Sequence, residues 1–231
     1  MSLDERFGSN TIEVLQQRIA SCELCPRLRA HCREVAVVKR RAYRDQEYWG
    51  RPVPSFGDPG ARLLIVGLAP GAHGANRTGR MFTGDASGEF LYSAMHATGW
   101  ASQPASTHRG DGLTLIDCYI TAAGRCAPPD NKPLPEELRA CRPYLEEEVR
   151  LLNRVQVAVA LGRIAFDTCL AVFGVAKSRY EFGHDRLFEL GPGQPMLISS
   201  YHPSQQNTST GRLTQPMLRA VFERASSVLT G

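Results

Sequence analysis

Short apolar runs alternate with segments of helical spacing along most of this chain. Four runs rich in β-branched residues are typical of buried strands in a parallel sheet: residues 63–66, 113–121, 155–161 and 195–201. Apolar residues recur at helical spacing in residues 11–21, 88–98, 135–152, 163–173 and 218–228. This alternation predicts an α/β protein with a doubly wound sheet and four central strands.

A loop rich in glycine follows the first predicted strand and runs to Ser87, before the helix that Gly99 ends. Its glycines are Gly67, Gly71, Gly74, Gly79 and Gly84. A strand, a glycine loop and a helix in this order bring backbone N–H groups close to an anion or a flat ligand. The alternative is a long connection whose glycines serve turns alone, but loops of this length are usually functional.

Two further strand ends should lie beside this loop, since parallel strands end at one edge of the sheet. The second strand ends near Thr121, and the last strand leads into His202, Pro203 and the polar residues 204–212. Hydroxyl and amide groups of that kind suit phosphate oxygens. His202 could present its imidazole to a ligand there, although a single histidine is as often structural.

Composition leaves the class of partner open. The 231 residues carry a net charge of +4, which permits nucleic acid as a partner without requiring it. No apolar run approaches the length of a membrane span, and residues 1–10 lack the apolar core of a signal peptide. We therefore expect a single domain over residues 1–231, located in the cytoplasm.

Seven cysteines in a chain of this kind favour metal ligation or buried thiols over disulfides. Two of them, Cys118 and Cys169, lie in apolar segments that predict inert core thiols. The four predicted metal ligands are Cys22, Cys25, Cys126 and Cys141, with Cys32 in reserve. Four thiolates can hold zinc or an iron–sulfur cluster, and the spacing does not choose between them.

Residues 39–51 read KRRAYRDQEYWGR, with cations interleaved among Tyr43, Tyr48 and Trp49. This pattern suits a nucleic-acid strand, with the cations on phosphates and the rings on bases. The alternative is a solvated surface loop. The chain has no Gly-x-Ser-x-Gly motif, no Walker A motif and no dinucleotide fingerprint, so those enzyme classes lack support.

Two long motifs, GLAPGAHGANRTGRMFTGD at 67–85 and HPSQQNTSTGR at 202–212, resemble those of the uracil-DNA glycosylase superfamily, specifically its fifth family. The four-cysteine pattern and YWGRPVPSFGDP at 48–59 resemble the same family. The resemblance implies a three-layer α/β/α fold around a mainly parallel four-stranded sheet. It also implies a [4Fe–4S] cluster that ties the N-terminal segment to the domain, and excision of damaged bases from DNA.

The resemblance also implies roles for individual residues. Phe82 stands where the family stacks an aromatic ring on the extruded base, and His202 is expected to donate to the base O2 and stabilise the leaving anion. Three polar residues, Asn76, Asp85 and His73, are candidates to orient the attacking water, each equally suited to a structural role. The predicted catalytic residues are His202, Asn76 and Asp85; the base-binding residues are Gly67, Ala69, Gly71, His73, Phe82 and Ala122; the DNA-binding residues are Ser204, Gln205, Asn207 and Arg212.

Two positions depart from related families. Ala69 replaces an Asp or Asn that orients water in some relatives, and Ala122 replaces an Asn that reads the uracil edge in the related thermostable family. We therefore expect a monofunctional glycosylase that removes uracil and other deaminated bases such as hypoxanthine. No lyase step is expected, because neither motif contains lysine.

Two alternatives stay open at this point. One is a metal-stapled DNA-binding module that recognises damaged or abasic sites without excision. The other is a nucleotide-processing α/β enzyme whose glycine loop binds phosphate. In the leading hypothesis the partner is damaged DNA, no membrane is involved, and the protein is a monomer.

Overall fold

A six-stranded sheet with the order β1-β3-β2-β4-β6-β5 forms the centre of the protein. The structure is a computed structural model and describes residues 11–231. The strands are β1 (Phe56–Gly57), β2 (Leu63–Gly67), β3 (Cys118–Ala122), β4 (Val157–Leu161), β5 (Arg186–Phe188) and β6 (Met196–Ser200). The four central strands are parallel, as predicted, while β1 and β5 pair antiparallel at the two edges. These edge strands have two and three residues, too few for a clear pattern.

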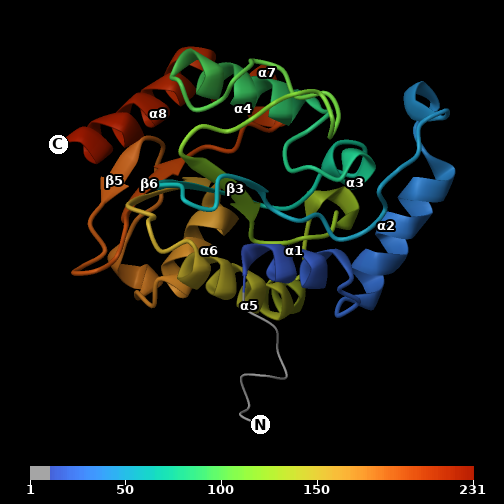
Figure 1. Cartoon of the computed structure of the whole chain (residues 1–231), viewed down its shortest axis with the longest axis horizontal. Helices are drawn as coiled ribbons and strands as arrows, with labels where there is room; N and C mark the ends of the chain where they lie inside the picture. Colours follow the sequence, from blue (N-terminus) through green and yellow to red (C-terminus); the bar gives the residue numbers. More distant parts are fainter. Residues whose placement is uncertain (1–10) are drawn as a thin grey trace, which may run out of the picture.

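Helices cover both faces of the sheet (Figure 1). The α-helices are α1 (Ile12–Ala20), α2 (Pro26–Val38), α3 (Ala75–Thr78), α4 (Ala86–Ala97), α5 (Pro135–Leu151), α6 (Arg163–Val172), α7 (Gln205–Ser209) and α8 (Gln215–Thr230). Short 3₁₀ helices within the described residues are η2 (Arg41–Tyr43), η3 (Pro129–Asn131) and η4 (Lys177–Arg179). The apolar spacing had predicted α1, α4, α5, α6 and α8.

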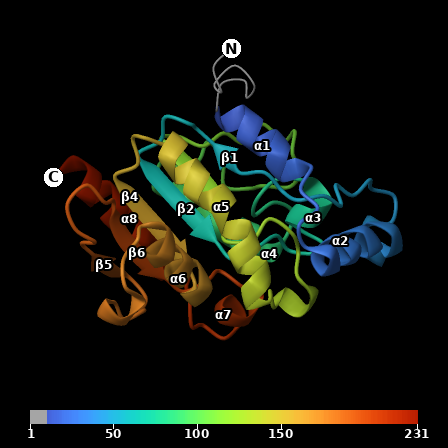
Figure 2. The ribbon, with the colours of Figure 1, turned by 90° about the horizontal axis from the view of Figure 1, so that it is seen from below.

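Alternate residues of each central strand enter opposite halves of the core, because successive side chains point to opposite faces of a sheet. Leu63 and Ile65 of β2 pack with α4 and α8, whereas Leu64 and Val66 pack with α1, α5 and α6. Figure 2 shows the second of these layers in front of the sheet. The three-layer α/β/α arrangement is therefore confirmed.

Some predicted boundaries were wrong, and the third predicted strand, for example, begins at Val157 rather than residue 155. The second strand begins at Cys118 rather than residue 113, because Asp117 takes a positive φ of 51° that interrupts the extended chain. Helix α4 begins at Ala86 rather than after Ser87: Asp85 is the N-cap, and its side chain accepts a hydrogen bond from the Gly88 N–H.

Helix α2 had no clear prediction in the sequence. It begins at Pro26, a residue well suited to a first helical turn, and buries only Leu28, Arg29 and Cys32. Within residues 11–231, no helix combines the length and apolar character needed to cross a membrane. The prediction that residues 1–10 are no signal peptide lies outside the described residues.

Candidate active site

The carboxyl ends of the central strands are held in a fixed relation by backbone hydrogen bonds that continue past the strands. Beyond β3, the N–H groups of Ala123 and Gly124 donate to the carbonyls of Gly67 and Leu68, both at 2.9 Å. Beyond β4, the Gly162 N–H donates to the Ser200 carbonyl of β6 at 2.8 Å. The loops that carry the two sequence motifs therefore leave the sheet from one rigid edge.

His202 lies two residues past β6, partly buried against the turn that follows β4. A Cβ at Gly162 would come within 3.2 Å of the His202 Cβ, so this turn packs closely on the histidine. Asn207 donates its side-chain amide to the His202 carbonyl at 2.9 Å, which fixes the backbone there. Burial lowers the pKa of His202 to about 4, so the imidazole is neutral at pH 7.

Phe82 faces His202, with ring centroids 6.0 Å apart. Its φ is +50°, which is uncommon for an aromatic residue and marks a constrained position. The ring rests on Gly67 at the end of β2, where a Cβ would come within 2.7 Å of it. Gly67 is therefore needed for the ring to reach this place, and the structure brings Phe82, Gly67 and His202 together.

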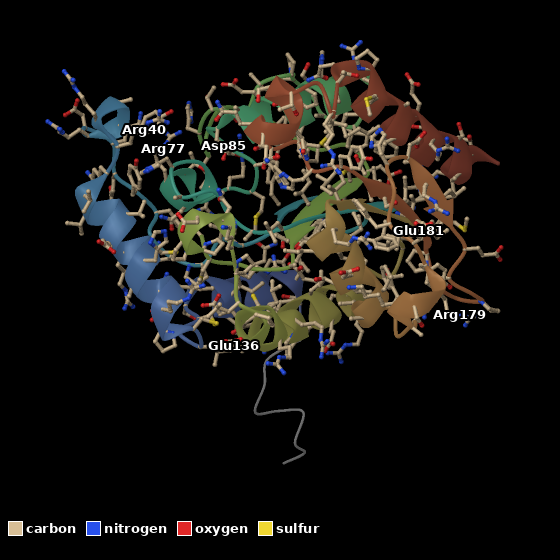
Figure 3. The ribbon with its side chains drawn as sticks, turned by 180° about the vertical axis from the view of Figure 1, so that it is seen from behind. Arg40, Arg77, Asp85, Glu136, Arg179 and Glu181 are labelled. Atoms are coloured by element: carbon tan, nitrogen blue, oxygen red, sulfur yellow. The ribbon has the colours of Figure 1, made fainter. Side chains whose placement is uncertain are left out.

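Asp85 closes the glycine loop from the other side. One carboxylate oxygen caps α4, and the other faces the loop so closely that a Cβ at Gly74 would lie 1.8 Å from it, and one at Gly71 2.7 Å. Burial raises the pKa of this carboxyl group, although backbone hydrogen bonds and Arg77 act in the opposite direction. Figure 3 shows Arg77 and Asp85 at the same end of the molecule.

The other two candidates for orienting water have partners inside the protein. Asn76 is fully buried and donates its amide to the carbonyls of Cys32 and Ala72, both at 3.4 Å. His73 shares a hydrogen bond of 3.1 Å with the Tyr48 hydroxyl group, and burial, Arg40 and Arg77 lower its pKa. Within residues 11–231, neither the Asn76 nor the His73 side chain is hydrogen-bonded to His202. The catalytic roles of Asn76 and His73 stay predictions.

The two alanines lie at different depths. Ala122 is 1% exposed and pairs with Gly67 in the sheet, so it lies beside the support of the Phe82 ring. Ala69 lies at the start of the glycine loop, 3.5 Å from where a Cβ of Gly124 would be. Ala69 also lines a cavity behind the loop, described below.

Among the predicted DNA-binding residues, Ser204 and Gln205 begin α7, Asn207 lies within it, and Arg212 follows it. Ser204 is the N-cap of α7 and accepts a hydrogen bond from the Asn207 backbone N–H, while the Asn207 side chain donates to the His202 carbonyl, so both side chains serve the local backbone. Gln205 is exposed, and the guanidinium of Arg212 lies 4.7 Å from the ring centroid of Tyr201. Gln205 and Arg212 are the two members whose side chains are free to meet a ligand.

Arg77 is a positioning residue that the sequence did not reveal. Its buried guanidinium donates to the carbonyls of His73 at 2.8 Å and Gly84 at 2.7 Å, and to the Gln46 side chain at 2.5 Å. The only signal in the sequence was a lone arginine inside a glycine loop, whose fork of donors can satisfy several carbonyls. Arg77 thus fixes both ends of the loop and the residue before Asp85.

A second unpredicted cluster fixes the end of β3. Arg125 and Glu148 form a buried ion pair, 2% and 0% exposed, and Ser55 joins both. Thr121 of β3 donates its hydroxyl group to Glu148 at 2.7 Å. Because the loss of either member would leave an uncompensated buried charge, this cluster joins β3 firmly to α5.

A cavity of about 450 Å³, its open mouth included, lies behind the same loops. All four cysteines predicted as ligands line it, and Ala69 and Gly124 belong to its wall on the side of the strand ends. Cys32 does not line it and instead points its thiol at the Ala127 carbonyl, 3.6 Å away. Cys118 and Cys169 are core thiols, as predicted.

The donor set of this cavity fits an iron–sulfur cluster. Within residues 11–231, no three histidine, cysteine, aspartate or glutamate side chains are close enough to hold a single metal ion. Zinc would need its thiolates within about 2.3 Å of one point. Four cysteine thiols around one cavity are instead the ligand set of an iron–sulfur cluster, in which each thiolate binds its own iron.

Comparison with known proteins gives one consistent result. A family model described as the uracil DNA glycosylase superfamily matches residues 54–226. A type-5 uracil-DNA glycosylase of Thermus thermophilus is 56% identical over 213 residues, which cover 92% of this chain and 96% of the relative. A type-5 uracil-DNA glycosylase of Pyrobaculum aerophilum is 42% identical over 210 residues, covering 91% and 90% of the two chains. A type-4 uracil-DNA glycosylase of Archaeoglobus fulgidus is 29% identical over 174 residues, covering 74% and 76%.

Proposed function

Since the chain belongs to the uracil DNA glycosylase superfamily, with type-5 relatives over nearly its whole length, we propose that it is a monofunctional uracil-DNA glycosylase of DNA repair. Such an enzyme hydrolyses the bond between a uracil base and its deoxyribose. The observation that carries the proposal is the pair formed by the neutral His202 imidazole and the Phe82 ring at the edge of the sheet.

Base recognition is assigned to Phe82. The target nucleotide cannot be reached inside a duplex and has to be extruded. The Phe82 ring is partly exposed and is supported from behind by Gly67, so it can act as a rigid stacking surface. A surface fixed before binding loses little entropy when the base arrives.

His202 is the group that acts on the leaving base. Breakage of the glycosidic bond leaves negative charge on the base and positive charge on the sugar. A neutral imidazole can donate one N–H to the base O2, as a fixed donor of an oxyanion hole does. Backbone N–H groups of the Gly67–Gly74 loop are further donors in this proposal.

Asp85 is our preferred residue for orienting water among the three candidates. Its second carboxylate oxygen faces Gly71 and Gly74 with no protein donor bound to it among residues 11–231. The Asn76 Oδ1 also lacks a protein donor within residues 11–231, but Asn76 is fully buried, whereas Asp85 is partly exposed. An ionised carboxylate beside the sugar could also stabilise positive charge there.

We further propose that Cys22, Cys25, Cys126 and Cys141 hold a [4Fe–4S] cluster. Its part would be to join residues 22–25 to the segments after β3 through four Fe–S bonds, and no step of the hydrolysis is assigned to it.

The proposal extends to hypoxanthine as a second substrate base, supported by the small side chain at Ala122. It also includes action as a monomer in the cytoplasm.

The direct test uses uracil-containing single- and double-stranded oligonucleotides, treated with alkali after incubation with the protein. We expect strand breaks at the uracil position, and no breaks without alkali, because a monofunctional enzyme leaves an intact abasic site. Retarded DNA on a gel without alkali-dependent breaks would instead indicate a binding module. Nucleotide turnover with no action on DNA would indicate a nucleotide-processing enzyme.

A further inference from the structure

Residues 39–51, the segment of cations and aromatic residues, pack against the glycine loop. The N–H groups of Trp49 and Gly50 donate to the carbonyls of Arg77 and Asn76 at 2.9 and 3.0 Å. The guanidinium of Arg77 also lies 3.9 Å from the ring centroid of Tyr43. The end of this segment is therefore part of the surface around the His202 site.

The sequence pattern had suggested that the Trp49 ring stacks on a base, but in the structure this ring already has partners within the protein. Its N–H donates to the Pro52 carbonyl at 3.0 Å, and the ring packs so closely on Gly79 that a Cβ there would lie 2.8 Å from it. Two cations occupy the ring: the guanidinium carbons of Arg51 and Arg109 lie 4.0 and 4.9 Å from its centroid. Trp49 thus acts as a support for two arginines.

Arg109 is presented by a turn with a buried centre. Asp111 accepts hydrogen bonds from the N–H groups of Thr107 at 2.8 Å and Leu113 at 3.1 Å, and it pairs with Arg80 at 2.7 Å. Arg80 also donates to the Arg109 carbonyl at 3.3 Å. The turn that carries Arg109 is therefore fixed before any ligand arrives.

Neither cation on the indole has an anionic partner. Arg51 and Arg109 are exposed, and neither forms an ion pair with any residue of 11–231. Their guanidinium carbons are no more than about 9 Å apart, because both lie within 5 Å of one centroid. Two unpaired guanidinium groups held this close are suited to share one phosphate.

The distance to the His202 site matches this role. Gly79, on which the indole rests, is three residues before Phe82, so their Cα atoms are at most about 11 Å apart. One DNA strand carries a phosphate for about every 3.4 Å of helix rise. A phosphate bound at Trp49 would therefore lie within a few nucleotides of a base stacked on Phe82.

We propose that Arg51 and Arg109, held on the Trp49 ring, form a clamp for a DNA backbone phosphate close to the extruded nucleotide. The clamp rests on the proposed function, since the identity of its ligand follows from a DNA substrate. It reads no sequence: contacts to phosphate fix the position of the protein on the strand.

The test is equilibrium binding to a duplex that contains an uncleavable abasic-site analogue, measured by fluorescence anisotropy over a range of salt concentrations. We expect the double variant Arg51→Gln/Arg109→Gln to bind about tenfold more weakly, with a slope of log K against log salt that is shallower by about one. Trp49→Leu keeps both charges but removes their support, and we expect it to weaken binding by a smaller factor. Thermal melting identifies any variant that has lost its fold.

The matched control is Arg150→Gln/Arg179→Gln, which removes the same charge from exposed arginines without an ion pair in residues 11–231. Arg150 lies in the last turn of α5, on the chain segment that leads to the amino end of β4, and Arg179 lies at the far end from Arg77 (Figure 3). Native-like affinity and slope in the control support the clamp. A control that weakens binding as much as the clamp variant overturns it, and so does a clamp variant that binds like the native protein.

Failure of the proposed function gives a different result. Uracil excision by the native protein is scored separately on a cleavable duplex. If excision is absent while binding still depends on Arg51 and Arg109, the glycosylase assignment is wrong and the clamp stands. If excision is present and binding ignores both arginines, only the clamp is wrong.

Discussion

The His202 site and the cysteine cavity meet the same loop two residues apart, at Gly67 and Ala69, yet they are built in opposite ways. At the His202 site, the side chains come from loops directly attached to the strands, and close packing on Gly67 and Gly162 fixes them. In the cavity, the thiols come from segments more than 100 residues apart in the sequence, Cys22 and Cys25 on one side and Cys126 and Cys141 on the other.

This difference suggests that the His202 site carries the reaction and that the cysteine cavity stabilises the fold. The His202 site is rigid because the sheet and the glycines make it so, and it needs no group from the N-terminal segment. The cavity has few contacts of its own to hold α2, whose buried face contains only Leu28, Arg29 and Cys32. We therefore expect changes in the cavity to act first on stability and changes at the His202 site to act first on rate.

Replacement of a cavity cysteine should have the largest effect. We expect Cys126→Ala and Cys141→Ala to lose iron and brown colour, and to lower the free energy of unfolding by about 4 kcal/mol or more, because metal binding is coupled to folding. Iron analysis and thermal melting measure both effects. Cys169→Ala, in the buried face of α6, should keep its iron. A colourless native protein with one zinc would keep the four ligands but refute the iron–sulfur cluster.

Replacement of His202 should affect the rate of excision rather than stability, the opposite of a change in the cavity. We expect His202→Ala to slow single-turnover excision of uracil by about 10²–10³-fold, the usual effect of losing one oxyanion donor. DNA affinity should change little, because phosphate contacts dominate binding. A rate within about threefold of the native value would show that His202 is structural.

The strands and most helices could be predicted because each carries its own pattern of apolar residues. Residues 63–67 and 157–161 are buried at every position, and their runs of aliphatic residues say so. Helix α2 escaped prediction because its small buried face depends on partners such as Ala127, far away in the sequence. Where tertiary contacts decide, local spacing gives no signal.

The candidate site divides in the same manner. His202 and Phe82 could be named from the motifs, since each follows a strand end or a glycine turn. The role of Arg77 could not, because its acceptors at Gln46 and Gly84 meet only in the folded chain. The contacts of the Trp49 ring could not be predicted for the same reason. The sequence shows which cations lie close to Trp49 along the chain, but it does not show that the distant Arg109 packs on the same ring.

The neutral state of His202 gives a prediction for stability against pH. Its pKa is about 4 in the folded protein and about 6.5 when unfolded, so the unfolded chain binds the proton more readily. The native protein should therefore lose about 3 kcal/mol relative to His202→Gln as the pH falls from 7 to 4, with no relative change above pH 7. Urea unfolding of both proteins measures the difference. Parallel curves would mean that His202 is as well solvated in the folded state as in the unfolded chain.

The smallest expected effect concerns specificity at the back of the His202 site. Ala122 is buried beside Gly67, so it offers a base no hydrogen bond and rejects none for lack of one. The native protein should therefore excise hypoxanthine as well as uracil. We expect Ala122→Asn to raise the ratio of uracil to hypoxanthine excision by about tenfold, the equivalent of one hydrogen bond of about 1.4 kcal/mol. Ala122→Leu has a similar size without the amide and separates the two explanations, because both substitutions push towards the Phe82 ring. If Ala122→Leu changes the ratio as much as Ala122→Asn does, the space at residue 122 sets the specificity. If the native protein removes uracil alone, Ala122 does not broaden the specificity.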